Sequence, residues 1–143
     1  MLLALGPAVI VTAPSAQAAS AAVTAGYEAR VLYLVNAERV KFGRAKLTLS
    51  ACPERYAESW TAHLASTGRF YHRDMMTYLR ACKVSRVAEN IARGNVSAER
   101  IVAAWMKSPG HRKNILNGQL TKIGVGAVHA RGVWTITTDF SRP

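Results

Sequence analysis

Three side chains of this sequence, His72, Glu89 and His111, are of types that could do chemistry together. Two imidazoles and one carboxylate suffice as protein ligands of Zn²⁺, with a water molecule in the fourth position. The same three groups could instead act as a general acid and base. Each also has a plain structural explanation, since His72 could cap a helix and Glu89 could pair with one of many basic side chains. The residues lie far apart in the sequence, so their types alone do not place them in one site.

The segment around His111 adds a physical clue. Ser108 and Pro109 suit the N-cap and the first position of a short helix, which makes His111 the third helical residue. The positive end of the helix dipole disfavours a charged imidazole there, and the neutral form is the one that binds metals or acts as a base. Ser108 is the hydroxyl nearest to a candidate base. Because an N-cap hydroxyl usually accepts from backbone N–H groups, we do not expect Ser108 to be a nucleophile.

The elements that must position these residues can be predicted from hydrophobic spacing. Apolar side chains recur at helical intervals over residues 24–42, and Gly43 ends the pattern. Further helices are predicted over residues 53–66, 74–82, 97–106 and 109–116, whereas residues 84–93 show no clean period. From residue 123 onward the period changes to two, and a turn at 130–132 predicts an antiparallel hairpin. Helices followed by a hairpin indicate one α+β domain, with helices packed on a small antiparallel sheet.

Several motifs together resemble the CAP superfamily, also called the SCP or pathogenesis-related-1 domain, in its compact bacterial form. The main ones are Leu-Val-Asn-Ala-Glu-Arg at 34–39, Phe-Tyr-His at 70–72, Ala-Glu-Asn-Ile at 88–91 and Trp-Met-Lys-Ser-Pro-Gly-His-Arg-Lys-Asn-Ile-Leu at 105–116. The last motif is highly specific. The resemblance covers about residues 27–140, and we place the domain at residues 24–143. It implies a single-domain α-β-α sandwich, in which a small antiparallel sheet lies between helical layers.

The resemblance also implies a cleft with two histidines and two acidic residues. Carried over residue by residue, His72 and His111 are the histidines and Glu89 is one acid, while Ser108 lies where the second acid is expected. His72, Glu89 and His111 are therefore the candidate catalytic residues, and His72 and His111 could hold a divalent metal such as Zn²⁺. We expect a binding or interaction module with a peptide, lipid or glycan ligand. The alternative is a metal-dependent, peptidase-like hydrolase, and the sequence does not decide whether the protein is an enzyme.

Residues 1–18 are typical of a cleaved secretory signal peptide. They carry no charged side chain, and an apolar run over residues 2–13 precedes Ala-Gln-Ala at 16–18, a small-x-small cleavage pattern. A run of that length is too short to span a bilayer, so we expect a secreted or envelope-associated protein without a transmembrane segment. In an oxidising compartment Cys52 and Cys82 are the natural disulfide pair. Two buried free thiols are the alternative.

The basic composition suggests an anionic partner. Lys and Arg number 19 against eight Asp and Glu, which gives a formal net charge of +11. An anionic cell-wall polymer would explain this charge. We expect no nucleic-acid partner, because the basic residues form no single stripe interleaved with aromatic residues. Motifs for dinucleotides, P-loop phosphates and zincin metal sites are absent from the sequence. We expect the domain to be a monomer.

Overall fold

The computed structural model describes residues 13–143. Most of the expected signal peptide, residues 1–12, lies outside the described residues, and its last residues, from Ala16, begin the first helix. In chain order the elements are α1 (Ala16–Lys41), β1 (Thr48–Leu49), α2 (Ala51–Thr67), α3 (Met75–Cys82), β2 (Arg86–Gly94), α4 (Ala98–Lys107), α5 (Pro109–Ile115), β3 (Lys122–Ala130) and β4 (Val133–Arg142). Each helix predicted from the sequence, and the predicted hairpin, therefore corresponds to an element of the structure.

Four strands form one sheet in the order β1-β3-β4-β2. The hairpin strands β3 and β4 are antiparallel, and β2 pairs antiparallel with β4 along its whole length. The two-residue β1 pairs parallel with β3, with Thr48 opposite Lys122. The sheet is thus mixed rather than wholly antiparallel as expected. No sequence pattern indicated the parallel strand, because the two residues of β1 are too few to show a strand period.

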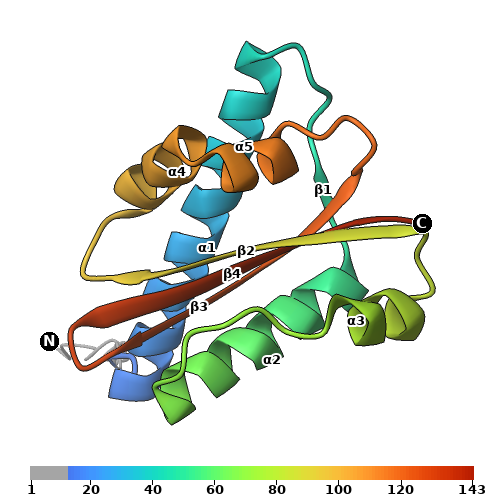
Figure 1. Ribbon diagram of the computed structural model, residues 1–143. Helices are drawn as coiled ribbons and strands as arrows, with labels where there is room; N and C mark the ends of the chain where they lie inside the picture. The colour runs from blue at the N-terminus through green and yellow to red at the C-terminus, as the bar shows by residue number, and fades with distance from the viewer. Residues whose placement is uncertain (1–12) are drawn as a thin grey trace, which may run out of the picture.

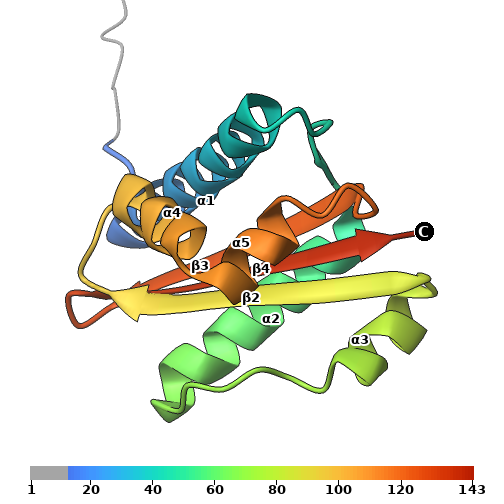
Figure 2. The ribbon, with the colours of Figure 1, turned by 45° about the horizontal axis from the view of Figure 1, so that its top comes forward.

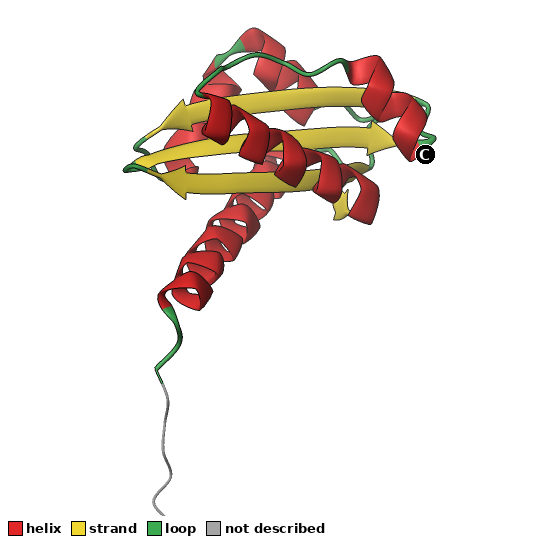
Figure 3. Ribbon diagram, turned by 90° about the horizontal axis from the view of Figure 1, so that it is seen from below, coloured by secondary structure: helices red, strands yellow, loops and turns green. Residues whose placement is uncertain are grey.

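Helices cover both faces of the sheet, as expected for an α-β-α sandwich. Figure 1 shows α4 and α5 above the three long strands, α1 behind them, and α2 and α3 below. Seen from below, α2 lies across the three long strands (Figure 3). Strand β2 forms one edge of the sheet and runs between the α4–α5 layer and the α2–α3 layer (Figure 2).

The main hydrophobic core lies on the face covered by α1, α4 and α5. Val31 and Val35 of α1, Ile101 and Trp105 of α4, and Phe140 of β4 are among its buried members. Burial of such side chains, at about 25 cal/mol per Å² of apolar surface, is the main force that holds this layer to the sheet. No helix in the described range 13–143 combines the length and apolarity needed to cross a membrane.

Helix α2 packs unusually close to the opposite face because glycines lie beneath it. A Cβ atom at Gly124 would collide with the backbone of Pro53, and one at Gly126 would collide with the backbone of Ala57. The glycines of the Lys-Ile-Gly-Val-Gly segment therefore have a packing role. They allow α2 to approach β3 within main-chain contact distance.

The predicted disulfide between Cys52 and Cys82 is present and ties two helices together. Cys52 is near the start of α2, Cys82 is the last residue of α3, and their Cα atoms lie 5.7 Å apart. The chain between the two helices, residues 68–74, carries His72. The disulfide thus joins two residues that are 30 positions apart in the sequence, and the loop it closes contains one of the candidate site residues.

Candidate functional site

The structure brings His72 and Glu89 into direct contact. His72 lies in the segment between α2 and α3, and Glu89 lies in the middle of β2. The distance from His72 Nδ1 to Glu89 Oε1 is 2.7 Å. Since a carboxylate can only accept, Nδ1 carries the proton and the ring presents Nε2 outward. The His72 side chain is 55% exposed whereas that of Glu89 is 1% exposed, so a buried carboxylate orients a solvent-facing imidazole.

The second carboxylate oxygen of Glu89 accepts a hydrogen bond from Arg73, a residue that was not predicted from the sequence. Arg73 Nε donates to Glu89 Oε2 over 2.9 Å. Arg73 Nη2 donates to Asp139 Oδ2 over 2.7 Å and to the backbone oxygen of Tyr56 over 2.7 Å. The Arg73 side chain is 7% exposed and has aromatic rings around its guanidinium. This buried side chain holds the carboxylate of Glu89 in place, and Glu89 in turn orients the ring of His72.

Asp139 is the buried partner at the far end of this chain of contacts. It lies opposite Glu89 in the β2–β4 register, and its side chain is fully buried. Burial raises the pKa of Asp139 well above its usual range; Arg73 opposes this rise and Glu89 adds to it. One carboxylate oxygen, Oδ1, has no hydrogen-bond partner in the described structure. Two carboxylates share one guanidinium, and the burial of Asp139 favours its neutral form.

Two asparagines place His111 beside Glu89. Asn90 of β2 donates from Nδ2 to the backbone oxygen of His111 over 3.2 Å. Asn114 of α5 donates from Nδ2 to Asn90 Oδ1 over 2.9 Å and to the backbone oxygen of Glu89 over 3.2 Å. These bonds hold α5 against the edge strand β2. The site therefore consists of two pieces of chain, residues 68–74 and α5, attached to the same strand.

The side chain of Ser108 does not cap α5, contrary to the sequence-based expectation. It makes no capping hydrogen bond to the helix backbone. Its Oγ lies 2.9 Å from His111 Nδ1 and shares a hydrogen bond with that ring. The pKa of His111 is lowered, first by burial and then by the nearby charge of His72. His111 is thus a neutral imidazole held by a neutral hydroxyl.

The arrangement does not fit a three-ligand metal centre. Across residues 13–143, no group of three or more His, Cys, Asp or Glu side chains is arranged so that it could hold a metal ion. Both oxygens of Glu89 are already bound, one by His72 and one by Arg73. A catalytic zinc site needs three protein ligands and an open position. Glu89 acts instead as an orienting partner of an imidazole.

A groove opens beside His111, between β2 and α4. It has a volume of about 660 Å³, and Ile91, Trp105, Ser108 and His111 contribute to its lining. His72 and Glu89 are not among its lining residues. Of the three residues predicted from the sequence, His111 lines this groove.

The sequence of this chain is similar to a known protein family and to two curated proteins. The family described as the Cysteine-rich secretory protein family, CAP, matches residues 32–140. Two curated proteins of Bacillus subtilis strain 168 are similar: the uncharacterized protein YkwD, 38% identical over 76% of this chain and 45% of its own length, and the uncharacterized membrane protein YlbC, 32% identical over 69% and 31%. The chain thus spans less than half the length of either relative.

Solved structures show the same fold. An extracellular SCP-domain protein of Bacillus anthracis superposes with a TM-score of 0.81 at 23% identity, over 92% of this chain and 45% of that one. An outer surface protein of Borrelia burgdorferi superposes with a TM-score of 0.77 at 19% identity, over 83% of this chain and 94% of that one. The specific motifs, the fold and the matched span agree. The chain belongs to the CAP, or cysteine-rich secretory protein, family.

Proposed function

We propose that this chain is an extracellular binding module of the bacterial cell envelope, with its ligand held at the groove beside His111. The observation that carries this proposal is the state of the His111 imidazole, which lines the groove. Its Nδ1 is held by Ser108, and its Nε2 has no protein partner among residues 13–143. An oriented ring with an open Nε2 on a concave surface is a hydrogen-bonding group prepared for a ligand.

Several features of the chain support an envelope location. Similar structures come from extracellular and outer surface proteins. The disulfide between Cys52 and Cys82 is typical of oxidising compartments. The net charge of +11 favours retention by anionic wall polymers. These observations favour a secreted module held at the cell surface.

The hydrolase alternative has weaker support from the site. Nucleophilic catalysis by a hydroxyl needs a base that is itself oriented by a third group. Ser108 contacts His111, but in the described part of the chain no carboxylate contacts that imidazole. Metal-dependent hydrolysis needs a ligand set that Glu89 does not complete, since its oxygens are bound to His72 and Arg73. Ligand binding without catalysis requires neither of these additions, only the groove and its oriented imidazole.

Co-sedimentation of the purified chain with purified bacterial cell walls tests the proposal. Binding through the general positive charge should weaken with salt, because exposed charges are screened within about 8 Å at physiological ionic strength. The salt-resistant part should fall about tenfold in His111→Ala, the loss expected for one hydrogen-bonding group. His63→Gln, which removes an imidazole of α2 outside the groove, is the matched control and should bind as the wild type does.

Two outcomes would contradict the proposal. Equal salt-resistant binding by the wild type and His111→Ala would mean that the groove is not the site. Release of soluble fragments from the walls by the wild type, and not by His72→Gln, would identify a hydrolase instead of a binding module.

A further inference from the structure

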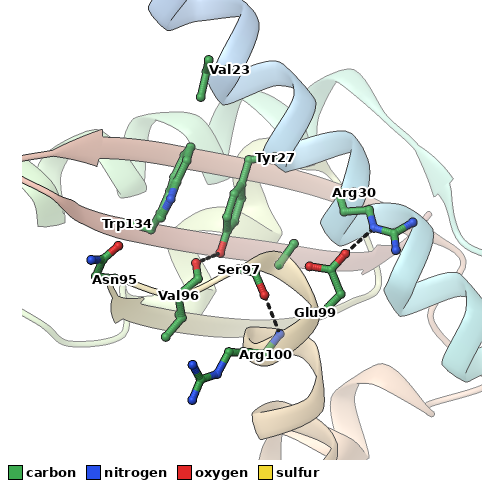
Figure 4. A pocket seen from close by; sticks show the side chains of 10 residues that line it. Val23, Tyr27, Arg30, Asn95, Val96, Ser97, Glu99, Arg100 and Trp134 are labelled. Carbon is green, nitrogen blue, oxygen red and sulfur yellow. Dashed lines mark hydrogen bonds and ion pairs between the residues drawn. The ribbon is translucent and has the colours of Figure 1, made fainter.

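The groove beside His111 continues into a second hollow around the start of α4. The second hollow has a volume of about 600 Å³ and lies between α1, α4 and the first residues of β4 (Figure 4). Val96 and Arg100 line both hollows. The two therefore adjoin and form one surface track, which we call the α4 track. It extends from Tyr27 and Trp134 at one end to Trp105 and His111 at the other.

Two unpaired cations lie along the α4 track. Arg100 and Lys107 are exposed, and within the described residues neither has a carboxylate within ion-pair distance. They are seven positions apart, so they share one face of α4 at a separation of about 10 Å along the axis. Ala103 and Ala104 lie between them on the lining. Small side chains flanked by two cations leave room for an elongated anionic ligand.

The other charged side chains at the track already have protein partners. Arg30 pairs with Glu99 at 2.7 Å, as Figure 4 shows. The guanidinium of Arg93 donates to backbone oxygens at the end of α2, including that of Leu64 at 2.7 Å. The groove between β2 and α4 has no acidic lining residue. Arg93 keeps its positive charge but uses its donors on backbone oxygens, so Arg100 and Lys107 are the lining cations that, among residues 13–143, have no ion-pair partner.

The end of the track far from His111 is aromatic and polar. Tyr27 and Trp134 stand as a parallel pair with ring centroids 3.9 Å apart, and Tyr27 OH donates to the backbone oxygen of Val96 over 3.0 Å (Figure 4). Asn95 and Ser97 flank this pair on the loop before α4. Aromatic surface beside amide and hydroxyl groups suits sugar rings, which have apolar faces and hydroxyl edges.

Strand addition by a peptide is disfavoured at this edge of the sheet. An extended peptide would need the outward backbone groups of β2. The outward oxygen of Glu89 already accepts from Asn114, and that of Ile91 accepts from Trp105 Nε1 over 3.4 Å. Side chains therefore occupy the positions that a peptide backbone would take. A ligand that binds through charges, hydroxyl groups and ring faces fits the track better.

We propose that the α4 track binds a linear glycan that bears carboxylate groups. Arg100 and Lys107 pair with carboxylates along the chain, the Tyr27–Trp134 pair contacts sugar rings at one end, and His111 hydrogen-bonds hydroxyl groups at the other. This inference rests on the proposed binding function and specifies the class of ligand.

Titration of the full chain with an oligogalacturonate, followed by NMR, tests the inference. The indole N–H of Trp134 and the ring of His111 should shift together with one dissociation constant. Arg100→Gln/Lys107→Gln should weaken binding about tenfold. The control Arg55→Gln/Arg80→Gln removes the same charge from exposed positions on α2 and α3 and should keep the wild-type affinity. A neutral oligosaccharide of equal length should bind about tenfold more weakly than the oligogalacturonate.

Three results would overturn the inference. Equal weakening by the control pair would show nonspecific charge attraction, and equal affinity for an oligoglutamate peptide would show an acidic-peptide site. A shift confined to one of the two resonances would show that the hollows do not act as one track. Wall binding that depends on His111 without oligogalacturonate binding would refute this inference and leave the proposed function standing. Loss of both would refute both.

Discussion

Glu89 and Asp139 share the guanidinium of Arg73, and the pH dependence of stability tests whether Asp139 is protonated in the folded chain. Arg73 neutralises one of two negative charges whose side chains are almost fully buried. Burial raises the pKa of Asp139 well above its usual value. In the unfolded chain Asp139 regains an ordinary aspartate pKa of about 3.9. Between these two pKa values the folded chain binds more protons than the unfolded chain.

The sign of the pH dependence follows directly. The stability due to protonated Asp139 is fully present below about pH 4 and is lost as the pH rises through the folded-state pKa. Each unit of elevation corresponds to about 1.4 kcal/mol of unfolding free energy. Asp139→Asn stays neutral at every pH, and its amide oxygen can still accept from Arg73. Its unfolding free energy should match that of the wild type near pH 4 and exceed it increasingly toward about pH 7.

Denaturant titrations of both proteins, with the disulfide intact, measure this difference across the pH range. The pH-dependent part of the difference, divided by about 1.4 kcal/mol, gives the elevation of the Asp139 pKa. Asp74→Asn is a control of opposite sign, because hydrogen bonds from Thr77 and Met76 lower the pKa of that exposed carboxyl. Asp74→Asn should lose stability relative to the wild type as the pH rises. A difference for Asp139→Asn that stays constant from about pH 4 to about pH 7 would refute the reasoning.

Three further predictions concern the disulfide, the sheet and the site. Cys52→Ala/Cys82→Ala should lose roughly 3–4 kcal/mol in denaturant titrations, the loop-closure value for a separation of 30. Gly126→Ala should lose roughly 1–3 kcal/mol or more in the same assay, because its Cβ would overlap the backbone of α2. His72→Gln should raise the pKa of His111 in NMR titrations, because it removes a charge that repels the His111 imidazolium.

The glycine and histidine predictions each have a control within the chain. Gly26→Ala adds a methyl group where nothing lies within 4 Å, so it should gain up to about 1 kcal/mol of helix stability. His63→Gln removes an imidazole from α2 and should leave the titration of His111 unchanged. An unaltered denaturation midpoint without the cysteines would contradict the loop-closure argument. An unaltered His111 pKa in His72→Gln would mean that the two rings do not share a site.

Most of the secondary structure could be predicted because its apolar spacing is long and regular. The helices and the hairpin each present one apolar face to a single layer of the sandwich. Strand β2 showed no period because it is an edge strand whose middle residues are buried between two helical layers, with polar Glu89 and Asn90 among them. The two residues of β1 are too few for any period, so the parallel pairing had no sequence signal.

The site could be predicted only in part. His72, Glu89 and His111 were identified by resemblance, and their approach depends on long-range contacts through Asn90 that no local pattern encodes. Arg73 was missed because arginine is usually exposed, and its sequence neighbours do not indicate burial. Asp139 had a weak signal, since it shares one face of the last strand with Thr135 and Thr137, but its pairing with Glu89 needs the β2–β4 register.

The replacement of the expected second acid by Ser108 decides the charge of the site. The hydroxyl takes the same geometric role at His111 Nδ1 that a carboxylate takes at His72 Nδ1, so both rings are oriented. A hydroxyl adds no negative charge, and burial keeps the pKa of His111 low, so this half of the site stays neutral while Arg100 and Lys107 remain positive nearby. A carboxylate at position 108 would instead stabilise an imidazolium, the form that can act as a general acid. The hydroxyl therefore weakens the case for acid–base catalysis, and any preference for an anionic ligand in the groove must come from Arg100 and Lys107.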